Sequence, residues 1–569
     1  MEEGEEASLQ WLPVEVIHHI FSYLNPEEKA QASILSKNWL FAWRKNPKLQ
    51  FVDWDFYKPN WYPRNCCIYK NNPKKFRNYV NGILRKHQED HIEEFNLSMN
   101  LTSDDLASLN GWLRIAIKKG VKVLDLSLCA DMLSSPYSLP ENILLEAKSL
   151  TELRLAGCKF INVMMCKNIR VLKLFNVYID DETFRRVVEG CPFMDDLRIE
   201  ECVGLDTIRI INLSSLKKLF IQRLRNIEVD APTLEKMELS ILRYPRFLEL
   251  HASQNLKDLS LKKISIMGKS FFVDLMHKLP NLEYLEVKDC YVHGERVVNF
   301  TSHSLKHLCL SSISPSTKIQ IEIDAPRLVV FQFQCETILP NVSFMASRSS
   351  VSSSQMVSRI EINHQSPRIG AWWFQDLNKL LSSLIGSKIS IYITFWRLLQ
   401  SLEHILGGSS NHPSCVAVDV EKLKLKMPYS FITTWTEDRT NDLVDCLFLA
   451  CRPKTLVMHR IINRGDDFIS YLLKLLTTAE RIRNRDSCKS PDHDDIIKLW
   501  QDDLKEVVVE VKMKNGRKWR RLGPHDWKTN LLDDSLNFDE WTKIRFGLEW
   551  EVYSDSSKAK NHADVCFQA

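Results

Sequence analysis

The chain has 569 residues, of which 44% are hydrophobic and 26% charged, and its 76 basic and 72 acidic side chains give a net charge of +4. This composition is typical of a soluble globular protein, and the balanced charge gives no reason to expect nucleic acid or an anionic membrane as a partner. Uninterrupted apolar runs stay well below the roughly 18 residues of a membrane-spanning helix. The acidic segment 1–10 does not resemble a secretory signal or a transit peptide.

The fifteen cysteines occur without a secretory signal, which favours a reducing compartment with free thiols. The sequence contains no C-x-x-C, so the common zinc and thioredoxin signatures are missing, and we expect neither a metal site nor a cofactor. We interpret Cys66-Cys67 and the pair Cys446 and Cys451 as structural. Motifs of hydrolases, dinucleotide and phosphate binders and zinc proteases are also missing, so we expect no catalytic residue.

The first patterned segment is predicted to form three short helices. Pro13 suits a first helical turn, Asn25-Pro26 ends that helix and caps a second, and Ser36 caps a third that holds Trp39 and Trp43. Helical spacing gathers the apolar residues of the first helix on one side: Val16, Ile17, Ile20, Phe21, Tyr23 and Leu24. So short a segment buries little surface by itself, so its apolar side chains should meet either a larger core or another protein.

The order of residues in this segment resembles an F-box. The matching runs are Leu12-Pro13-x-Glu15-x-Ile17-x-x-Ile20-Phe21-x-x-Leu24 and Ala32-Ser33-x-Leu35-Ser36-x-x-Trp39. The resemblance implies docking onto a Skp1-like adaptor and, through it, a cullin. The positions that match the motif's adaptor contacts are Leu12, Pro13, Ile17, Ile20, Phe21, Leu24, Leu35, Ser36 and Trp39.

The body of the chain repeats the pattern L-x-x-L-x-L-x-x-C/N, from Ile92…Leu97 to Leu328…Phe333, with copies 18 to 29 residues apart. This is the pattern of leucine-rich repeats (LRR), in which each copy forms a short strand with its leucines inside a solenoid. Such arrays expose one face of a parallel sheet that suits a protein partner. The ninth position holds a cysteine in half of the copies, which we interpret as core residues: Cys129, Cys158, Cys202, Cys290 and Cys335.

Side chains between the last two leucines of each copy should point outward from the sheet. In four consecutive copies these are Arg154, Lys173, Arg198 and Phe220, which makes them candidate residues for binding the protein substrate. Two interpretations stay open. The row is either a mixed solvated face, neutralised by Glu152, Asp196 and Glu200, or a docking patch for an acidic segment of a partner.

The fold class predicted from these patterns is α/β, a three-helix F-box followed by an irregular LRR solenoid with a parallel sheet. We divide the chain into the F-box (1–50), a connecting segment (51–90), repeats (91–345), a Ser-rich linker (346–358), an irregular continuation (359–500) and a β-rich tail (501–569). In the continuation we expect strands at 359–362, 420–425 and 454–458 and helices near 374–386, 395–406, 440–450 and 467–485. The tail should contain a hairpin that turns at Asn515-Gly516.

As a whole the sequence resembles plant F-box/LRR proteins, including those with an FBD-like tail. The resemblance implies a non-catalytic, substrate-recognition subunit of a Skp1–cullin–F-box (SCF) ubiquitin ligase, in the nucleus and/or the cytoplasm. Its adaptor would be Skp1-like, and its protein substrate is not identified by the sequence. Two alternatives remain: an LRR module that binds proteins outside a ligase, and an F-box receptor that depends on a small molecule.

Overall fold

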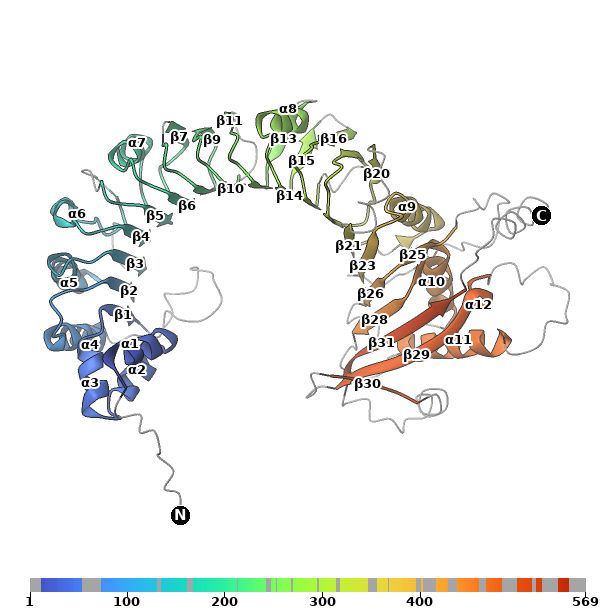
Figure 1. The fold of residues 1–569 in the computed structure, drawn as a ribbon, viewed down its shortest axis with the longest axis horizontal. Helices are drawn as coiled ribbons and strands as arrows, with labels where there is room; N and C mark the ends of the chain where they lie inside the picture. The colour runs from blue at the N-terminus through green and yellow to red at the C-terminus, as the bar shows by residue number, and fades with distance from the viewer. Residues whose placement is uncertain are drawn as a thin grey trace, which may run out of the picture. The chain divides into compact units, whose positions relative to one another are not determined.

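The structure is a computed structural model in which the chain divides into two compact units, residues 1–259 and 260–569 (Figure 1). We describe each unit separately. The described residues are 12–53, 73–129, 135–160, 167–211, 213–241, 247–251, 253–267, 270–293, 296–313, 318–345, 356–366, 368–395, 401–402, 416–427, 437–459, 467–483, 499–513, 518–523 and 541–551. Along these parts of the chain, no helix has the length and apolar character needed to cross a membrane.

The first unit begins with the three predicted helices, α1 (Val14–Tyr23), α2 (Pro26–Ala32) and α3 (Lys37–Arg44). Asn25 caps α2 through a capping box, in which its side chain and that of Glu28 each accept a hydrogen bond from the other's backbone N–H. Ser36 caps α3 by accepting a hydrogen bond from the Trp39 N–H. The helices close around a small core of their own, made of Ile17, Phe21, Trp39 and Ala42.

After these helices the first unit forms a parallel sheet. Its strands, each paired with the next, are β1 (Lys48–Val52), β2 (Glu94–Asn100), β3 (Val123–Cys129), β4 (Glu152–Ala156), β5 (Val171–Phe175), β6 (Asp196–Glu200), β8 (Lys218–Gln222) and β10 (Lys236–Ser240). The repeat leucines align in register, as with Leu153, Leu172 and Leu197, and all three are buried. The predicted LRR solenoid is confirmed.

Four of these strands are directly followed by a residue with positive φ, in the left-handed backbone region. Gly157 follows β4 with φ 70°, and Asn176, Glu201 and Arg223 follow β5, β6 and β8 with φ of 49°, 54° and 69°. Side chains rarely adopt this conformation, so the repeat imposes it. At Gly157 a Cβ atom would lie 1.8 Å from the carbonyl oxygen of Leu128, which only glycine allows.

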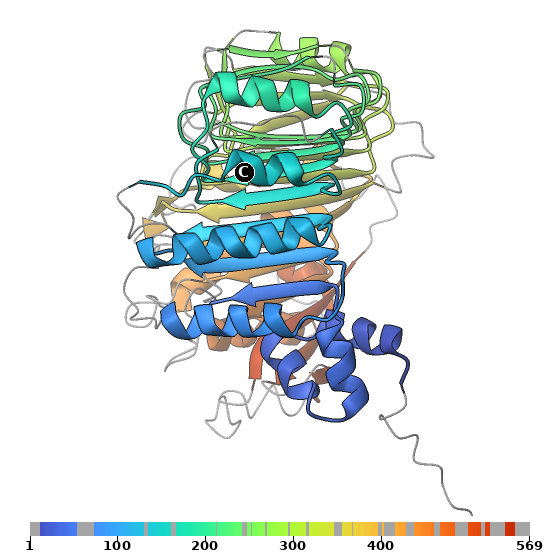
Figure 2. The same ribbon diagram turned by 90° about the vertical axis from the view of Figure 1, so that its left-hand side faces the viewer.

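The secondary structure on the side of each coil opposite the main sheet depends on the length of the repeat. Repeats of 25–29 residues have room for a helix, as in α5 (Leu106–Lys118), α6 (Glu141–Glu146) and α7 (Asp181–Gly190), which with α4 (Pro73–Lys86) cover one face of the sheet (Figure 2). The three repeats of 18–22 residues that start at Met194, Leu216 and Leu234 instead carry a second set of parallel strands, β7 (Thr207–Ile211), β9 (Asn226–Asp230) and β11 (Phe247–Leu250). The leucine pattern does not predict this second sheet.

The second unit is also built around a row of parallel strands. Strand β12 (Asp258–Lys262) spans the unit boundary, and the parallel strands after it are β14 (Tyr284–Lys288), β17 (His307–Ser311), β19 (Val330–Cys335), β21 (Val357–His364), β23 (Lys388–Phe395), β26 (Lys422–Lys426) and β28 (Thr455–His459). The β-rich tail adds antiparallel strands to the end of this row. Strand β31 (Trp541–Trp550) pairs with β28 on one side and with β29 (Leu504–Met513) on the other. Strand β30 (Trp519–Arg521) forms the outer edge beside β29.

The other side of the second unit carries helices and short strand pairs. The helices are α8 (Phe271–Lys278), α9 (Ala371–Ser382), α10 (Glu437–Ala450), α11 (Asp467–Arg483) and α12 (Leu499–Asp503). The short strands are β13 (Ser265–Met267), β15 (Tyr291–His293), β16 (Val297–Thr301), β18 (Gln320–Asp324), β20 (Asn341–Phe344), β22 (Arg368–Ile369), β24 (Ser401–Leu402), β25 (Val418–Val420) and β27 (Cys451–Pro453).

Most elements predicted after residue 345 are confirmed, with one exception. The helix expected at 395–406 is wrong where that stretch is described, because Phe395 ends β23 and Ser401–Leu402 form β24. The division at residue 50 falls inside β1, whose Leu49 and Phe51 are buried in the first layer of the solenoid. Val357 and Ser358, placed in the linker, already belong to β21. Residues 346–355 of the linker, Cys66-Cys67 and the Asn515-Gly516 turn lie outside the described residues, as do residues 54–72 of the connecting segment.

Candidate functional site

The F-box helices leave large apolar side chains at the surface. Ile34 is 85% exposed, Tyr23 76% and Leu35 58%, and Val16 and Phe41 are each more than 40% exposed. Ile34 and Leu35 both lie in the turn between α2 and α3. Large apolar side chains concentrated in so small a module are typical of a protein-binding surface.

The nine predicted adaptor contacts differ in their burial and in their role within the module. Ile17, Phe21 and Trp39 form the core of the module, and the rings of Phe21 and Trp39 pack edge to face at 5.7 Å. Their side chains hold the helices together and are not at the surface. Ser36 acts as the cap of α3. Leu12, Ile20 and Leu24 pack partly against the core, whereas Pro13 and Leu35 are exposed. The apolar periodicity of α1 predicted neither this division nor the exposure of Ile34.

Backbone hydrogen bonds fix the F-box helices to the first repeat. The N–H of Gln88 donates to the carbonyl of Arg44 at 3.1 Å, and the N–H of Glu93 donates to that of Pro47 at 2.8 Å. The buried ring of His87 lies 3.0 Å from the carbonyl oxygen of Asn46, and burial lowers the pKa of this histidine. Because two of these contacts are hydrogen bonds between backbone groups, the module is held in place beside the repeats.

The predicted row of outward side chains is present, and its cations are paired. Arg154, Lys173 and Arg198 lie in register on β4, β5 and β6. Glu152 accepts a hydrogen bond from Arg154 at 2.7 Å and lies 3.5 Å from the Lys173 ammonium. Asp125 lies 3.4 Å from Arg154; burial raises the pKa of Asp125, and Arg154 opposes that rise.

Arg198 completes the row with two contacts. It pairs with Glu200, and its guanidinium carbon lies 4.2 Å from the ring centroid of Phe220. These pairings give the row a structural role as a mixed face. The binding of a substrate by Arg154, Lys173, Arg198 and Phe220 stays a prediction.

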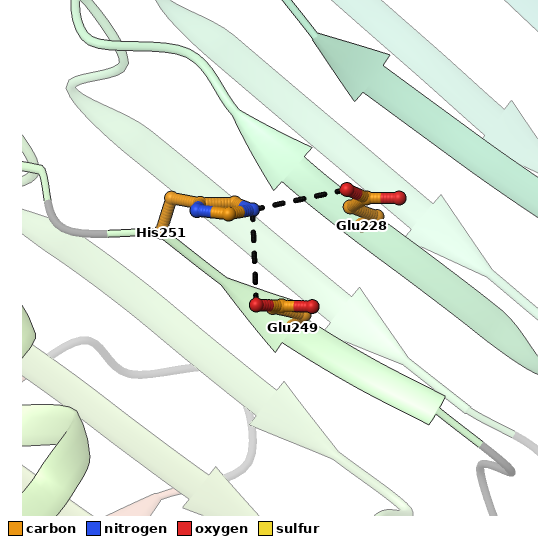
Figure 3. A group of neighbouring side chains, drawn as sticks. All are labelled: Glu228, Glu249 and His251. Carbon is orange, nitrogen blue, oxygen red and sulfur yellow. Dashed lines mark ion pairs between the residues drawn. The ribbon is translucent and has the colours of Figure 1, made fainter.

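A cluster of charged side chains on the second sheet was not singled out by the sequence. Glu228 on β9 faces Glu249 on β11, and the Nε2 atom of His251 lies 3.9 Å and 4.0 Å from their carboxylates (Figure 3). Arg209 on β7 also approaches Glu228, at 3.2 Å. Like charges on facing strand positions repel, and the guanidinium of Arg209 offsets that repulsion. We interpret the cluster as an ion-pair network; its signal was the recurrence of acids at the alternate positions of successive short strands.

The cysteines at the ninth repeat position were predicted to be core residues, and they are buried to different degrees. Cys158, Cys290 and Cys335 are buried, whereas Cys129 and Cys202 are half-buried. The Cys290 thiol lies within hydrogen-bonding distance of the carbonyl oxygens of Leu261 and Lys288. Burial raises the pKa of the Cys158 and Cys290 thiols to about 12, which leaves them protonated and unreactive at neutral pH.

Comparison with known proteins agrees with this architecture. The family model described as the F-box domain matches residues 9–51, and the one described as "At1g61320/AtMIF1, LRR domain" matches residues 83–248. The chain therefore combines an F-box domain with a leucine-rich repeat domain.

Curated relatives from Arabidopsis thaliana have the same combination in their names. F-box/LRR-repeat protein At3g59200 is 26% identical over 254 residues, which cover 41% of this chain and 46% of the relative. F-box/FBD/LRR-repeat protein At5g56420 is 24% identical over 41% of this chain and 54% of its own length. Putative F-box/LRR-repeat protein At3g18150 is 24% identical over 333 residues, which cover 54% of this chain and 66% of the relative. The chain thus spans about half to two thirds of the relatives it matches, and it is similar to plant F-box/LRR-repeat proteins, some of which contain an FBD.

Proposed function

We propose that this chain is the substrate-recognition subunit of an SCF-type ubiquitin ligase. The F-box helices bind a Skp1-like adaptor, the adaptor binds a cullin, and the repeat array binds the protein to be ubiquitinated. The observation that carries the proposal is a helical module with its own core that still exposes Ile34, Leu35 and Tyr23. A module that only capped the solenoid would direct such side chains toward the repeats.

The chain's contribution to ubiquitin transfer is positional. Other subunits bring ubiquitin activated as a thioester, and this chain holds near it a substrate lysine whose amine is the nucleophile, which raises the effective concentration of that amine. Positioning requires a stiff connection between the adaptor-binding and substrate-binding parts. The backbone hydrogen bonds from Arg44 and Pro47 to the first repeat provide that connection within the first unit.

Removing residues 1–45 should abolish capture of a Skp1-like adaptor and leave the solenoid folded. This truncation retains β1, so the edge of β2 stays covered. A longer truncation of residues 1–53 removes β1 as well and should lower the melting temperature, because it uncovers Phe95 and Leu97, which β1 pairs against.

Circular dichroism and adaptor pull-down on the two truncations and the full chain check this expectation. Adaptor capture by the folded 46–569 chain at the affinity of the full chain would contradict the proposed role of the F-box. Failure of the full chain to capture the adaptor would instead favour an LRR module that acts outside a ligase of this kind.

A further inference from the structure

One face of the sheet in the second unit collects positive charge. On β21, β23, β26 and β31 the side chains alternate, with Ile360, Ile391, Leu423 and Ile544 fully buried and their neighbours turned to the other face. Among the residues on that other face are Arg359, Tyr392, Lys422, Lys424 and Lys543. We call the four cations Arg359, Lys422, Lys424 and Lys543 the basic face.

Tyr392 holds two of these cations in place. The guanidinium carbon of Arg359 lies 4.7 Å from the centroid of the Tyr392 ring, and the ammonium of Lys424 lies 5.5 Å from it. The cations come from the strands on either side of β23, so the ring lies between them. Contacts of this kind order long basic side chains that would otherwise move freely.

The basic face lacks the neutralisation found in the first unit. There, Arg154, Lys173 and Arg198 each pair with a carboxylate. None of the four cations of the basic face forms an ion pair with another residue that the structure describes. Burial, and then the charges of Lys543, Lys422, Lys426 and Arg359, lower the pKa of Lys424.

Four carboxylates lie on the same face of β21, β29 and β31: Glu361, Glu506, Glu510 and Glu549. Glu361 is opposite Tyr392 in the strand register. Glu510 is already bound to Arg545, at 2.5 Å. The positive charge of the basic face therefore exceeds the negative charge beside it, and adjacent like charges in a sheet cost stability that a bound anion would recover.

The spacing of the cations suits an extended chain. Arg359, Lys424 and Lys543 lie two strands apart from one another and are shifted by two residues at each step. With strands about 4.8 Å apart and about 3.3 Å per residue, the three form a straight diagonal with steps of about 12 Å. Four residues of an extended peptide advance about 13 Å and return the side chain to the same side.

We propose that the basic face binds an extended acidic segment of a partner protein, with carboxylates about four residues apart placed against Arg359, Lys424 and Lys543. The Tyr392 ring lies beneath the segment between two of these contacts. This inference goes beyond the proposed function, since the docking needs neither adaptor nor cullin. Only the identity of the partner rests on the proposed function: within a ligase, the segment belongs to the substrate.

The test uses the full chain and a fluorescent peptide with three repeats of Glu-Ser-Gly-Ser. A second peptide has the same composition with its three glutamates adjacent. The variant Lys424→Glu/Lys543→Glu reverses the basic face. Its matched control, Lys278→Glu/Lys379→Glu, makes the same change in net charge at exposed positions on helices α8 and α9, away from the sheet (Figure 1).

We expect the spaced peptide to bind the wild-type chain more tightly than the clustered peptide. The basic-face variant should bind the spaced peptide at least tenfold more weakly, and the control variant should bind it as the wild type does. Raising the salt concentration should weaken the wild-type complex. Thermal melting confirms that both variants are folded.

Three outcomes would overturn the inference. Equal loss of binding in both variants would mean a non-specific charge effect, and unchanged binding to the folded basic-face variant would place the peptide elsewhere. Tighter binding of a single-stranded oligonucleotide, lost in the same variant, would identify nucleic acid as the occupant. Each of these outcomes leaves adaptor binding untouched, so they are distinguishable from failure of the proposed ligase function.

Discussion

Replacing Ile34 and Leu35 with glutamate should abolish capture of a Skp1-like adaptor without unfolding the F-box helices. Both side chains are exposed, at 85% and 58%, so the change places no charge in the core of the module. Loss of one apolar anchor at an interface centre typically costs about 2 kcal/mol or more, so two anchors should weaken binding far more than tenfold. Isothermal titration with purified adaptor measures the effect.

A matched control distinguishes the loss of a specific adaptor contact from a general effect of removing exposed apolar side chains. Phe193→Glu/Val203→Glu changes two apolar side chains that are also exposed in the first unit but lie in the repeats, and it should leave adaptor affinity unchanged. Phe21→Ala, by contrast, removes a core side chain and should cost about 3–5 kcal/mol, with loss of helical signal. Full adaptor affinity in the folded Ile34/Leu35 variant would show that the adaptor binds elsewhere.

Asp105→Ala should destabilise the first unit by about 3–5 kcal/mol, because it leaves a largely buried arginine without its partner. The Asp105 carboxylate is fully buried and lies 2.6 Å from the guanidinium of Arg77 on α4. It also accepts hydrogen bonds from the N–H and the hydroxyl of Thr102. This contact joins α4 to the start of α5, so its loss should loosen the first repeats.

Urea unfolding followed by circular dichroism measures this change. Asp104→Ala removes the neighbouring, exposed carboxylate and should shift the midpoint little. Asp105→Asn keeps a hydrogen-bond acceptor for Thr102 but loses the charge, so it should fall between the two. Equal midpoints for the Asp104 and Asp105 variants would mean that the Arg77–Asp105 pair contributes nothing to stability.

Much of the fold could be predicted because apolar residues in the leucine pattern recur at every second position, and side chains along a strand alternate between two faces in the same way. The strands of the main parallel sheet from β2 to β19 begin where L-x-x-L-x-L predicts them. The second sheet was missed although Ile208-Arg209-Ile210 and Ile227-Glu228-Val229 alternate in the same way. Those strands lie in short repeats, where the chain has too few residues to form a helix and extends instead.

The functional surfaces were harder to predict than the strands. Helical periodicity showed that Ile17 and Phe21 share a face, but it does not distinguish a side chain covered by its own module from one covered by a partner. Arg359, Lys424 and Lys543 are far apart in the sequence. Parallel pairing through β23 puts Arg359 and Lys424 on one face, and Lys543 joins them because β31 pairs with β28 in antiparallel fashion. That pairing reverses the chain direction expected for a solenoid, and no repeat pattern indicates it.

The most direct test of the central claim is the mass of the complex that the full chain forms with a Skp1-like adaptor and a cullin. Size-exclusion chromatography with light scattering measures it, with the Ile34→Glu/Leu35→Glu variant as the control. We predict a complex with one copy of each protein for the wild type, and an adaptor–cullin pair that excludes the variant. Elution of the folded wild-type chain apart from the adaptor, at concentrations on the order of 10 μM where specific complexes form, would contradict the account.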